Sequence, residues 1–386
     1  MAAGVSSAAK AQTKTGIDML EGEQFASVRG KRVGLITNQT GVDAKGRRTI
    51  DVLAHAEGMN LVAIFSPEHG IRGNADAAIA NATDATTGLP VFSLYGETRR
   101  PTEAMLKGID ALVFDIQDAG VRFYTYVTTM AYSMAEAAKH RIPFIVLDRP
   151  DPIGGDVIEG PMLDRDRLSF TGYFPMPVRY GMTIGELAQM FNAENKIGAD
   201  VHVFGMGNWK RNQTYDQTGL KWIPPSPNLR TVDEAFLYPG IEILQAGGVS
   251  VGRGTDTPFE ILGAPWIRGP ELAAELEKRR IPGVQFTPAL FTPRDGLYKG
   301  ESCQGISIAI TDRAVLRAMW MGLEIAAALQ RFYPKQLQLA KTVELLGSKD
   351  TIERLERGEE PVQIEESWRD DLARFRTMRE KYLLYH

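Results

Sequence analysis

The sequence ALVFDIQDAGVRFYTYVTTMAYSMAEAAKHRIPFIVLDR, residues 111–149, contains two short apolar runs separated by a stretch with helical patterning. The runs at 111–116 and 144–149 each begin with four consecutive apolar residues, which is typical of strands that are buried on both faces of a sheet. Residues 126–140 between them carry the spacing of an amphipathic helix. A strand, a helix and a second strand together predict a parallel pair joined by a crossover helix.

The same alternation extends toward the N-terminus, with apolar runs at 32–38, 61–66 and 89–94 and helical patterning at 47–55 and 102–107. We therefore expect an α/β fold in which a Rossmann-like parallel sheet domain covers residues 16–160.

The stretch 148–161 is rich in proline and glycine, which indicates a rigid crossover and places a domain boundary near residue 160. Residues 161–386 are predicted to form a smaller α/β domain that closes an active-site cleft. Within it, Thr183 and Glu186 have the spacing of a capping box, residues 305–311 resemble a strand, and residues 312–332 are predicted to be helical.

The composition excludes several classes of protein. The chain has 386 residues with 44 basic and 48 acidic side chains, and a net charge of −4 provides no basic field for nucleic acid. No apolar run reaches the roughly 18 residues needed to span a bilayer, so no membrane insertion is expected. The single cysteine, Cys303, forms no internal disulfide and is predicted to be a buried apolar side chain. No glycine pattern supports a dinucleotide site, and no cofactor is expected.

Residues 1–15, MAAGVSSAAKAQTKT, are small and polar, and Ala9–Ala11 has the A-x-A form of a signal-peptidase site. Two interpretations remain open. A trimmed export signal predicts a periplasmic or secreted protein, whereas a disordered terminus is compatible with a cytoplasmic one.

Polar side chains follow the predicted strands at the points where the strands end. Asn38 follows the first run, Glu68 and His69 follow the second, and Asp115 and Asp118 follow the fourth. Because ligands of open parallel sheets bind beyond the carboxyl ends of the strands, these side chains are candidate site residues.

Glu68 is the strongest candidate, because it lies in a Pro-Glu-His-Gly turn directly after an apolar strand. An acid held rigidly at the sheet edge, with an apolar wall behind it, is suited to act as a general acid. The structural alternative is that Glu68 caps the next turn. For His69, a catalytic role and a packing role are equally supported.

Asp115 and Asp118 precede Arg122, Tyr124 and Tyr126 in one polar and aromatic segment. Such a segment fits a sugar-binding cluster, a metal site or an Asp–Arg pair that only holds the loop. Metal binding is the least favoured, because neither a two-histidine spacing nor an oxygen-rich calcium loop is present.

The second domain adds further candidate binding residues. Glycines on both sides of Arg253 allow a close backbone approach, and its planar guanidinium is suited to a carboxylate of an acidic substrate. The alternative is that Arg253 pairs internally with Asp256 or Glu260. Asp256 and Glu260 are themselves candidate substrate-binding residues beside Arg253. The remaining candidates are Ser226 and Asn228, in a proline-rich loop at 222–228 that must be extended.

Several motifs in this order resemble the NamZ (YbbC-like) family of exo-β-N-acetylmuramidases. The motifs are GLITNQTG (34–41), SPEHGIRG (66–73), DIQDAGVRFYTY (115–126), PSPN (225–228), GRGT (252–255) and GAPW (263–266). The resemblance extends from about residue 16 to the C-terminus.

The resemblance implies release of N-acetylmuramic acid from the non-reducing ends of peptidoglycan fragments, with Glu68 as the catalytic acid. The lactyl carboxylate of that sugar needs a cationic partner, for which Arg72, Arg122 and Arg253 are the candidates. The chain departs from the family at 245–248, where Gln-Ala-Gly-Gly replaces a common Glu-Gly-Thr-Asn.

The leading hypothesis is a glycosidase in which Glu68 protonates the leaving oxygen while Asp115 or Asp118 stabilises or activates the attacking species. Alternatively, the acetamido group of the substrate assists and an aspartate orients it. Two rival classes are a muropeptide-binding protein without activity and a metal-dependent hydrolase that uses Asp115, Asp118 and His69.

Overall fold

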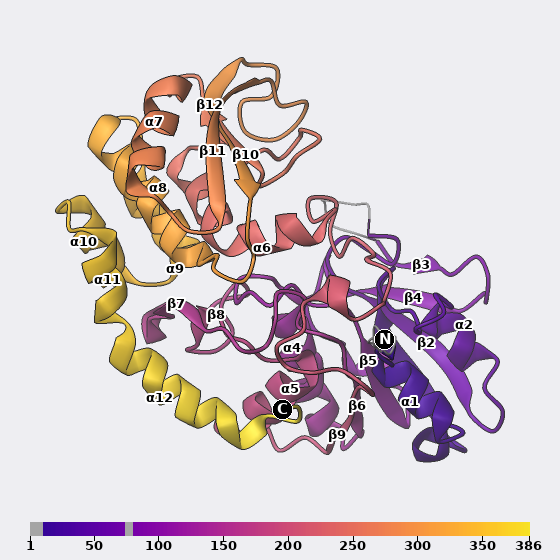
Figure 1. Cartoon of the computed structure of the whole chain (residues 1–386). Coiled ribbons are helices and arrows are strands. Elements are labelled where there is room, and N and C mark those ends of the chain that lie inside the picture. The colour runs from indigo at the N-terminus through magenta and orange to yellow at the C-terminus, as the bar shows by residue number, and fades with distance from the viewer. Residues whose placement is uncertain (1–10, 74–79) are drawn as a thin grey trace, which may run out of the picture.

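The computed structural model describes residues 11–73 and 80–386. Figure 1 shows two α/β units, one built on the larger sheet and one on a smaller sheet, with a helical arm that runs back from the second unit to the first. The α/β class predicted from the sequence is confirmed. Within the described residues, no helix has the length and apolar character needed to cross a bilayer.

The first unit contains a seven-stranded sheet with the order β3-β4-β2-β1-β5-β6-β9. All neighbouring pairs are parallel except β3 and β4, which are antiparallel. The five strands predicted from the sequence are all present in this sheet. The strands are β1 Arg32–Thr37, β2 Asn60–Ser66, β3 Ala82–Thr83, β4 Pro90–Ser93, β5 Ala111–Asp115, β6 Phe144–Leu147 and β9 Val201–Phe204.

Helices cover both faces of this sheet because successive strand side chains point to opposite faces. On β1, Val33 and Leu35 pack with α1 and α2, whereas Ile36 packs in the larger core that includes α4 and α5. The helices are α1 Gly16–Gly22, α2 Thr49–Ala54, α3 Glu103–Leu106, α4 Tyr126–Lys139 and α5 Ile184–Glu194.

The sheet continues past the boundary that the sequence predicted near residue 160. A short hairpin, β7 Glu159–Met162 with β8 Pro177–Arg179, follows the crossover, and α5 then leads into β9, which pairs with β6. The predicted capping box begins α5: Glu186 N donates to Thr183 Oγ1 at 3.3 Å, and Thr183 N donates to Glu186 Oε2 at 3.0 Å.

The second unit has an antiparallel sheet with the order β10-β12-β11, packed against helices. Cys303 begins β12 and is buried, as predicted. The helix predicted from residue 312 begins only at Ala318, because Arg317 is still extended. The elements are α6 Val232–Ile241, β10 Ile261–Ala264, α7 Gly269–Arg279, β11 Val284–Phe291, β12 Cys303–Ile310 and α8 Ala318–Phe332.

The helical arm returns to the first unit (Figure 1). It comprises α9 Val343–Leu346, α10 Lys349–Glu356, α11 Pro361–Ser367 and α12 Arg369–Arg379. At its end, Tyr385 OH donates to Asp148 Oδ2 at 2.5 Å, and Arg379 Nη1 donates to the carbonyl of Gly155 at 3.0 Å. The end of the helical arm is therefore hydrogen-bonded to the first unit.

Residues 13–15, which the sequence analysis placed in the N-terminal segment, are packed and hydrogen-bonded in the structure. Thr13 is fully buried, Lys14 N donates to the carbonyl of Gly207 at 2.8 Å, and Thr15 forms a capping box with Asp18 at the start of α1. The A-x-A motif itself falls mostly within residues 1–10, which lie outside the described residues.

Candidate active site

A cavity of about 170 Å³ lies where the strand ends of the first unit meet the second unit. It brings together the turn after β2, the start of α4, the 222–228 loop and the end of α6. Its lining comprises Glu68, His69, Phe123, Tyr124, Thr125, Tyr126, Thr171, Ser226, Tyr238, Glu242, Arg253 and Leu345. Six of the residues predicted from the sequence lie there: Glu68, His69, Tyr124, Tyr126, Ser226 and Arg253.

Glu68 reaches the cavity because the chain turns sharply after β2. Gly70 N donates to the carbonyl of Pro67 at 3.1 Å, and His69 adopts a left-handed backbone conformation with φ 65°. The half-buried Glu68 side chain accepts a hydrogen bond of 2.5 Å at Oε2 from Thr125 Oγ1. Thr125 lies at the start of α4, so this contact links the β2 turn to the helix beside it.

Aromatic side chains form the apolar wall of the cavity. The rings of Tyr124 and Tyr126 meet edge to face at 4.8 Å, and the ring of Tyr238 lies 6.0 Å from that of Tyr124. Burial raises the pKa of all three tyrosines, which keeps their hydroxyls neutral. Tyr126 OH also donates to the carbonyl of Pro225 at 2.9 Å, which holds the 222–228 loop over the strand ends.

Arg253 projects from the second unit and is held by a glutamate that the sequence analysis did not select. Its Nη2 lies 2.7 Å from Glu242 Oε1 and its Nε lies 3.2 Å from Glu242 Oε2. Burial raises the pKa of Glu242, whereas the adjacent guanidinium acts in the opposite direction. The predicted internal partners were different: Asp256 is exposed and pairs with Arg294, and Glu260 does not line the cavity.

Asp115 does not face the cavity. It is fully buried at the end of β5, where its Oδ1 lies 2.5 Å from Arg149 Nε and its Oδ2 lies 2.9 Å from Arg149 Nη2. Thr49 donates a further hydrogen bond to the same carboxylate. This arrangement joins neighbouring strand ends, so the contacts of Asp115 are structural and it does not line the cavity with Glu68.

Asp118 is also buried outside the cavity lining. It accepts hydrogen bonds from Tyr180 OH and, at 2.8 Å, from Gly120 N, and burial raises its pKa to about 6. Asn38 turns inward in the same way, with its Oδ1 accepting from Thr40 N at 2.9 Å. Both side chains stabilise the loops that carry the site.

Arg122, a predicted ligand for a substrate carboxylate, is completely buried and lies outside the cavity lining. Its Nη1 and Nη2 atoms donate to four carbonyl groups at 2.7–3.0 Å, and burial lowers its pKa to about 9. The four acceptors are the carbonyls of Pro161, Met176, Leu345 and Leu346. Arg122 therefore connects the β7–β8 hairpin to the end of α9.

The two remaining predicted residues are also outside the lining. Arg72 is exposed, and Asn228 is buried, with its N donating to Ser226 Oγ at 3.3 Å. Among the described residues, no group of three or more His, Cys, Asp or Glu side chains is arranged to hold a metal ion. The proposed combination of Asp115, Asp118 and His69 is therefore not assembled.

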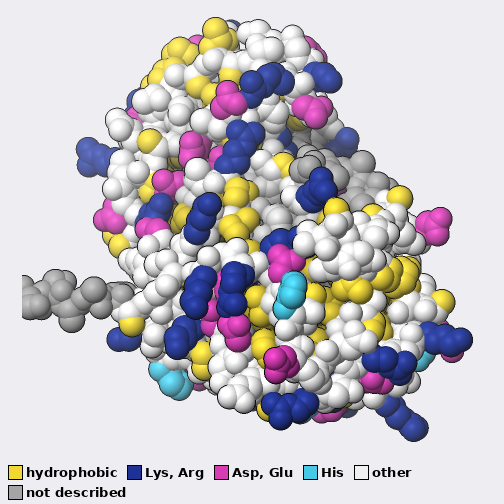
Figure 2. Space-filling model, turned by 90° about the vertical axis from the view of Figure 1, so that its right-hand side faces the viewer, with side chains coloured by type: hydrophobic (Ala, Val, Ile, Leu, Met, Phe, Trp, Pro, Cys, Tyr) yellow, Lys and Arg dark blue, Asp and Glu magenta, His cyan; other side chains and the backbone are white. Residues whose placement is uncertain are grey.

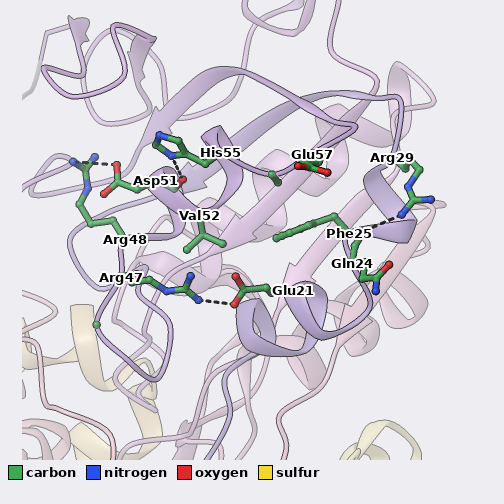
Figure 3. A pocket seen from close by; sticks show the side chains of 12 residues that line it. Glu21, Gln24, Phe25, Arg29, Arg47, Arg48, Asp51, Val52, His55 and Glu57 are labelled. Carbon is green, nitrogen blue, oxygen red and sulfur yellow. Dashed lines mark hydrogen bonds and ion pairs between the residues drawn. The ribbon is translucent and has the colours of Figure 1, made fainter.

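A larger cavity, of about 890 Å³, lies elsewhere, between the end of α1 and α2. Two pairs of its charged side chains are directed at each other (Figure 3): Arg47 lies 2.5 Å from Glu21, and Arg48 lies 3.8 Å from Asp51. It contains no residue that follows the carboxyl ends of β2 or β5. We therefore assign the chemistry to the smaller cavity.

A half-buried acid, hydrogen-bonded in an aromatic cavity at the carboxyl ends of a parallel sheet, is suited to general acid catalysis on a carbohydrate. Residues 33–233 match the model of the N-terminal region of exo-β-N-acetylmuramidase NamZ, and residues 236–385 match the model of its C-terminal region. The chain therefore belongs to the NamZ family, which confirms the resemblance found in the motifs, and it is a glycosidase.

Individual relatives agree with this assignment. The chain is 43% identical over 383 residues to the peptidoglycan β-N-acetylmuramidase NamZ of Bacillus subtilis, covering 98% of this chain and 92% of that protein. Crystal structures of two DUF1343 family proteins from Bacteroides fragilis have the same fold. One has a TM-score of 0.90 at 41% identity and the other has 0.81 at 31%, each covering 97% of this chain and 99% of its own.

Proposed function

We propose that this chain releases terminal N-acetylmuramic acid from peptidoglycan fragments, with Glu68 as the general acid. The single observation that carries the assignment is the position of Glu68, which lines the cavity and is fixed by Thr125 at 2.5 Å. Protonated Glu68 gives its hydrogen to the glycosidic oxygen as the bond to the anomeric carbon breaks. The resulting carboxylate later accepts a proton from the attacking water.

The arrangement of carboxylates favours help from the acetamido group of the substrate. Of the two acidic side chains that line the cavity in the described part of the chain, Glu242 is held in a bidentate pair with Arg253. In the first step, the acetamido oxygen bonds to the anomeric carbon while the leaving oxygen departs with the proton from Glu68. Water then attacks the same carbon and releases the sugar.

Arg253 is the best-placed cation for the lactyl carboxylate. It lines the cavity, and Glu242 and the ring of Phe259, 5.4 Å from its Cζ, together fix the plane of its guanidinium. The Nε and Nη2 edge of the guanidinium binds Glu242, so a substrate carboxylate would meet Arg253 at another edge of this fixed plane.

The test compares two leaving groups in the wild type and in Glu68→Gln. A 4-nitrophenyl N-acetylmuramide has a leaving group that departs without protonation, whereas the sugar of a MurNAc–GlcNAc disaccharide needs a proton. We expect Glu68→Gln to reduce disaccharide turnover by about 10²–10⁴-fold and nitrophenyl turnover much less. The matched control is Glu97→Gln, an exposed acid after β4, and it keeps wild-type rates on both. Equal losses on both substrates contradict the assignment of Glu68 as the acid.

A further inference from the structure

A stacked cation lies beside the candidate cavity. The Cζ atom of Arg99 lies 4.2 Å from the ring centroid of Phe170 and 5.7 Å from that of Tyr95, and the two rings are 6.2 Å apart. We refer to Arg99, Tyr95 and Phe170 as the Arg99 stack. Arg99 is exposed, and no described carboxylate lies within ion-pair distance of it.

The neighbouring arginine is different. The Cζ atom of Arg100 lies 3.6 Å from the ring centroid of Tyr132, and its Nη1 pairs with Glu136 at 3.5 Å. The charge of Arg100 is therefore balanced within the protein. The stack holds the Arg99 guanidinium in one plane at the surface, and no carboxylate in residues 11–73 or 80–386 balances its charge there.

The Arg99 stack is connected to the cavity through a short loop. Phe170 is followed by Thr171, which lines both the candidate cavity and a surface hollow of about 460 Å³ along residues 166–169. Tyr95 belongs to the segment after β4, where Leu94 N donates to the carbonyl of Ser66, two residues before Glu68. The stack and the candidate acid thus lie at the same sheet edge.

The size of the cavity requires part of the substrate to lie outside it. At about 170 Å³, it is smaller than the pockets of about 300–1,000 Å³ that enclose drug-sized ligands. A terminal sugar fills the space beside Glu68, and the remainder of a glycan chain must continue over the rim. On the Thr171 side, that rim carries the hollow and the Arg99 stack.

We propose that the Arg99 stack is a subsite for a carboxylate on the leaving-group side of the bond that is cleaved, an inference that rests on the proposed function. Peptidoglycan fragments carry such carboxylates on the lactyl group of the next muramic acid and on stem peptides. A guanidinium that is already ordered loses little conformational freedom when it binds an anion.

The experiment measures KM and kcat for four substrates: 4-nitrophenyl N-acetylmuramide, the MurNAc–GlcNAc disaccharide, the peptide-free MurNAc–GlcNAc–MurNAc trisaccharide, and that trisaccharide with a stem peptide on its reducing-end sugar. Both trisaccharides carry a carboxylate on the leaving-group side. We expect Arg99→Ala to raise KM about tenfold for at least one of them, as loss of one charge-assisted contact implies. The nitrophenyl muramide and the disaccharide carry no carboxylate on that side, so their KM values remain unchanged. Arg99→Lys keeps the charge but not the fork and is expected to give an intermediate KM.

The matched control is Arg357→Ala, which removes an exposed arginine at the end of α10. This variant keeps the wild-type KM and kcat for all four substrates. A rise confined to the peptide-free trisaccharide assigns the lactyl carboxylate, and a rise confined to the peptide-bearing one assigns the stem peptide; both support the subsite. The subsite is overturned if Arg99→Ala leaves KM unchanged for both trisaccharides. It is also overturned if KM rises equally for the nitrophenyl substrate. If the wild type fails to turn over even the nitrophenyl muramide, the proposed function is wrong and the subsite falls with it.

Discussion

Thr125→Val tests whether the Thr125–Glu68 hydrogen bond is needed for catalysis. The substitution removes the hydroxyl that donates to Glu68 Oε2 at 2.5 Å and keeps a side chain of similar shape. Glu68 becomes negatively charged as it gives up its proton in the transition state. A hydrogen bond to a charged group contributes about 1.5–3 kcal/mol, and each 1.4 kcal/mol corresponds to a factor of ten. Because the bond positions a catalytic group and not the substrate, we expect kcat on the MurNAc–GlcNAc disaccharide to fall by about 10–100-fold with little change in KM.

The fold should tolerate this change, because the Thr125 side chain makes no capping hydrogen bond at the start of α4. The urea midpoints of wild type and Thr125→Val are therefore expected to agree. Thr125→Ser restores the hydroxyl and should restore kcat to within a few-fold. A Thr125→Val enzyme with wild-type kcat would refute the reasoning, and so would a Thr125→Ser enzyme as slow as Thr125→Val.

Two further predictions concern stability. Arg122→Met leaves four buried carbonyl groups without their donor, so the free energy of unfolding should fall by at least about 3 kcal/mol in urea denaturation; an unchanged urea midpoint contradicts this. Burial raises the pKa of Asp151 to about 7 from an ordinary value of 3.8, so the folded state binds the extra proton between these pH values and stability is lost as pH rises from about 4 to 7. Asp151→Asn removes this contribution, so its urea midpoint should fall less than that of wild type between pH 5 and 8, and equal falls would show that Asp151 does not titrate in this range.

The central sheet could be predicted because its strands are buried on both faces and therefore form uninterrupted apolar runs. β6 follows this rule throughout, and β5 follows it up to Phe114. β9 was not predicted, because it is an edge strand whose side chains are partly exposed and its sequence VHVF includes a histidine. The predicted boundary near residue 160 therefore preceded the last strand of the sheet.

The candidate site was only partly predictable because a position at a strand end does not reveal the direction of a side chain. Glu68 and Asp115 both follow apolar strands, but Glu68 lines the cavity and Asp115 points into a buried pair with Arg149. Arg122 lies in the same motif as Thr125, and four carbonyl groups bind it in the interior. These partners are up to 224 residues away in the chain, so no local pattern indicates them.

The net charge of the protein could be predicted, because it depends on composition alone. Figure 2 shows Lys and Arg side chains interspersed with Asp and Glu over one face of the molecule, as the nearly balanced counts imply. The Arg99 stack could not be inferred in this way, because its order comes from rings contributed by two separate segments.

The departure at 245–248 has a structural interpretation that the sequence alone did not provide. Gln245 lies in a 3₁₀ helix, η4 Glu242–Gly247, and side chains three residues apart in such a helix lie on the same side. Glu242 is therefore one turn before Gln245, and it is the residue that lines the cavity and binds Arg253. Glu242 thus supplies a carboxylate to the cavity one turn before position 245, where this chain has none, and this carboxylate orients Arg253.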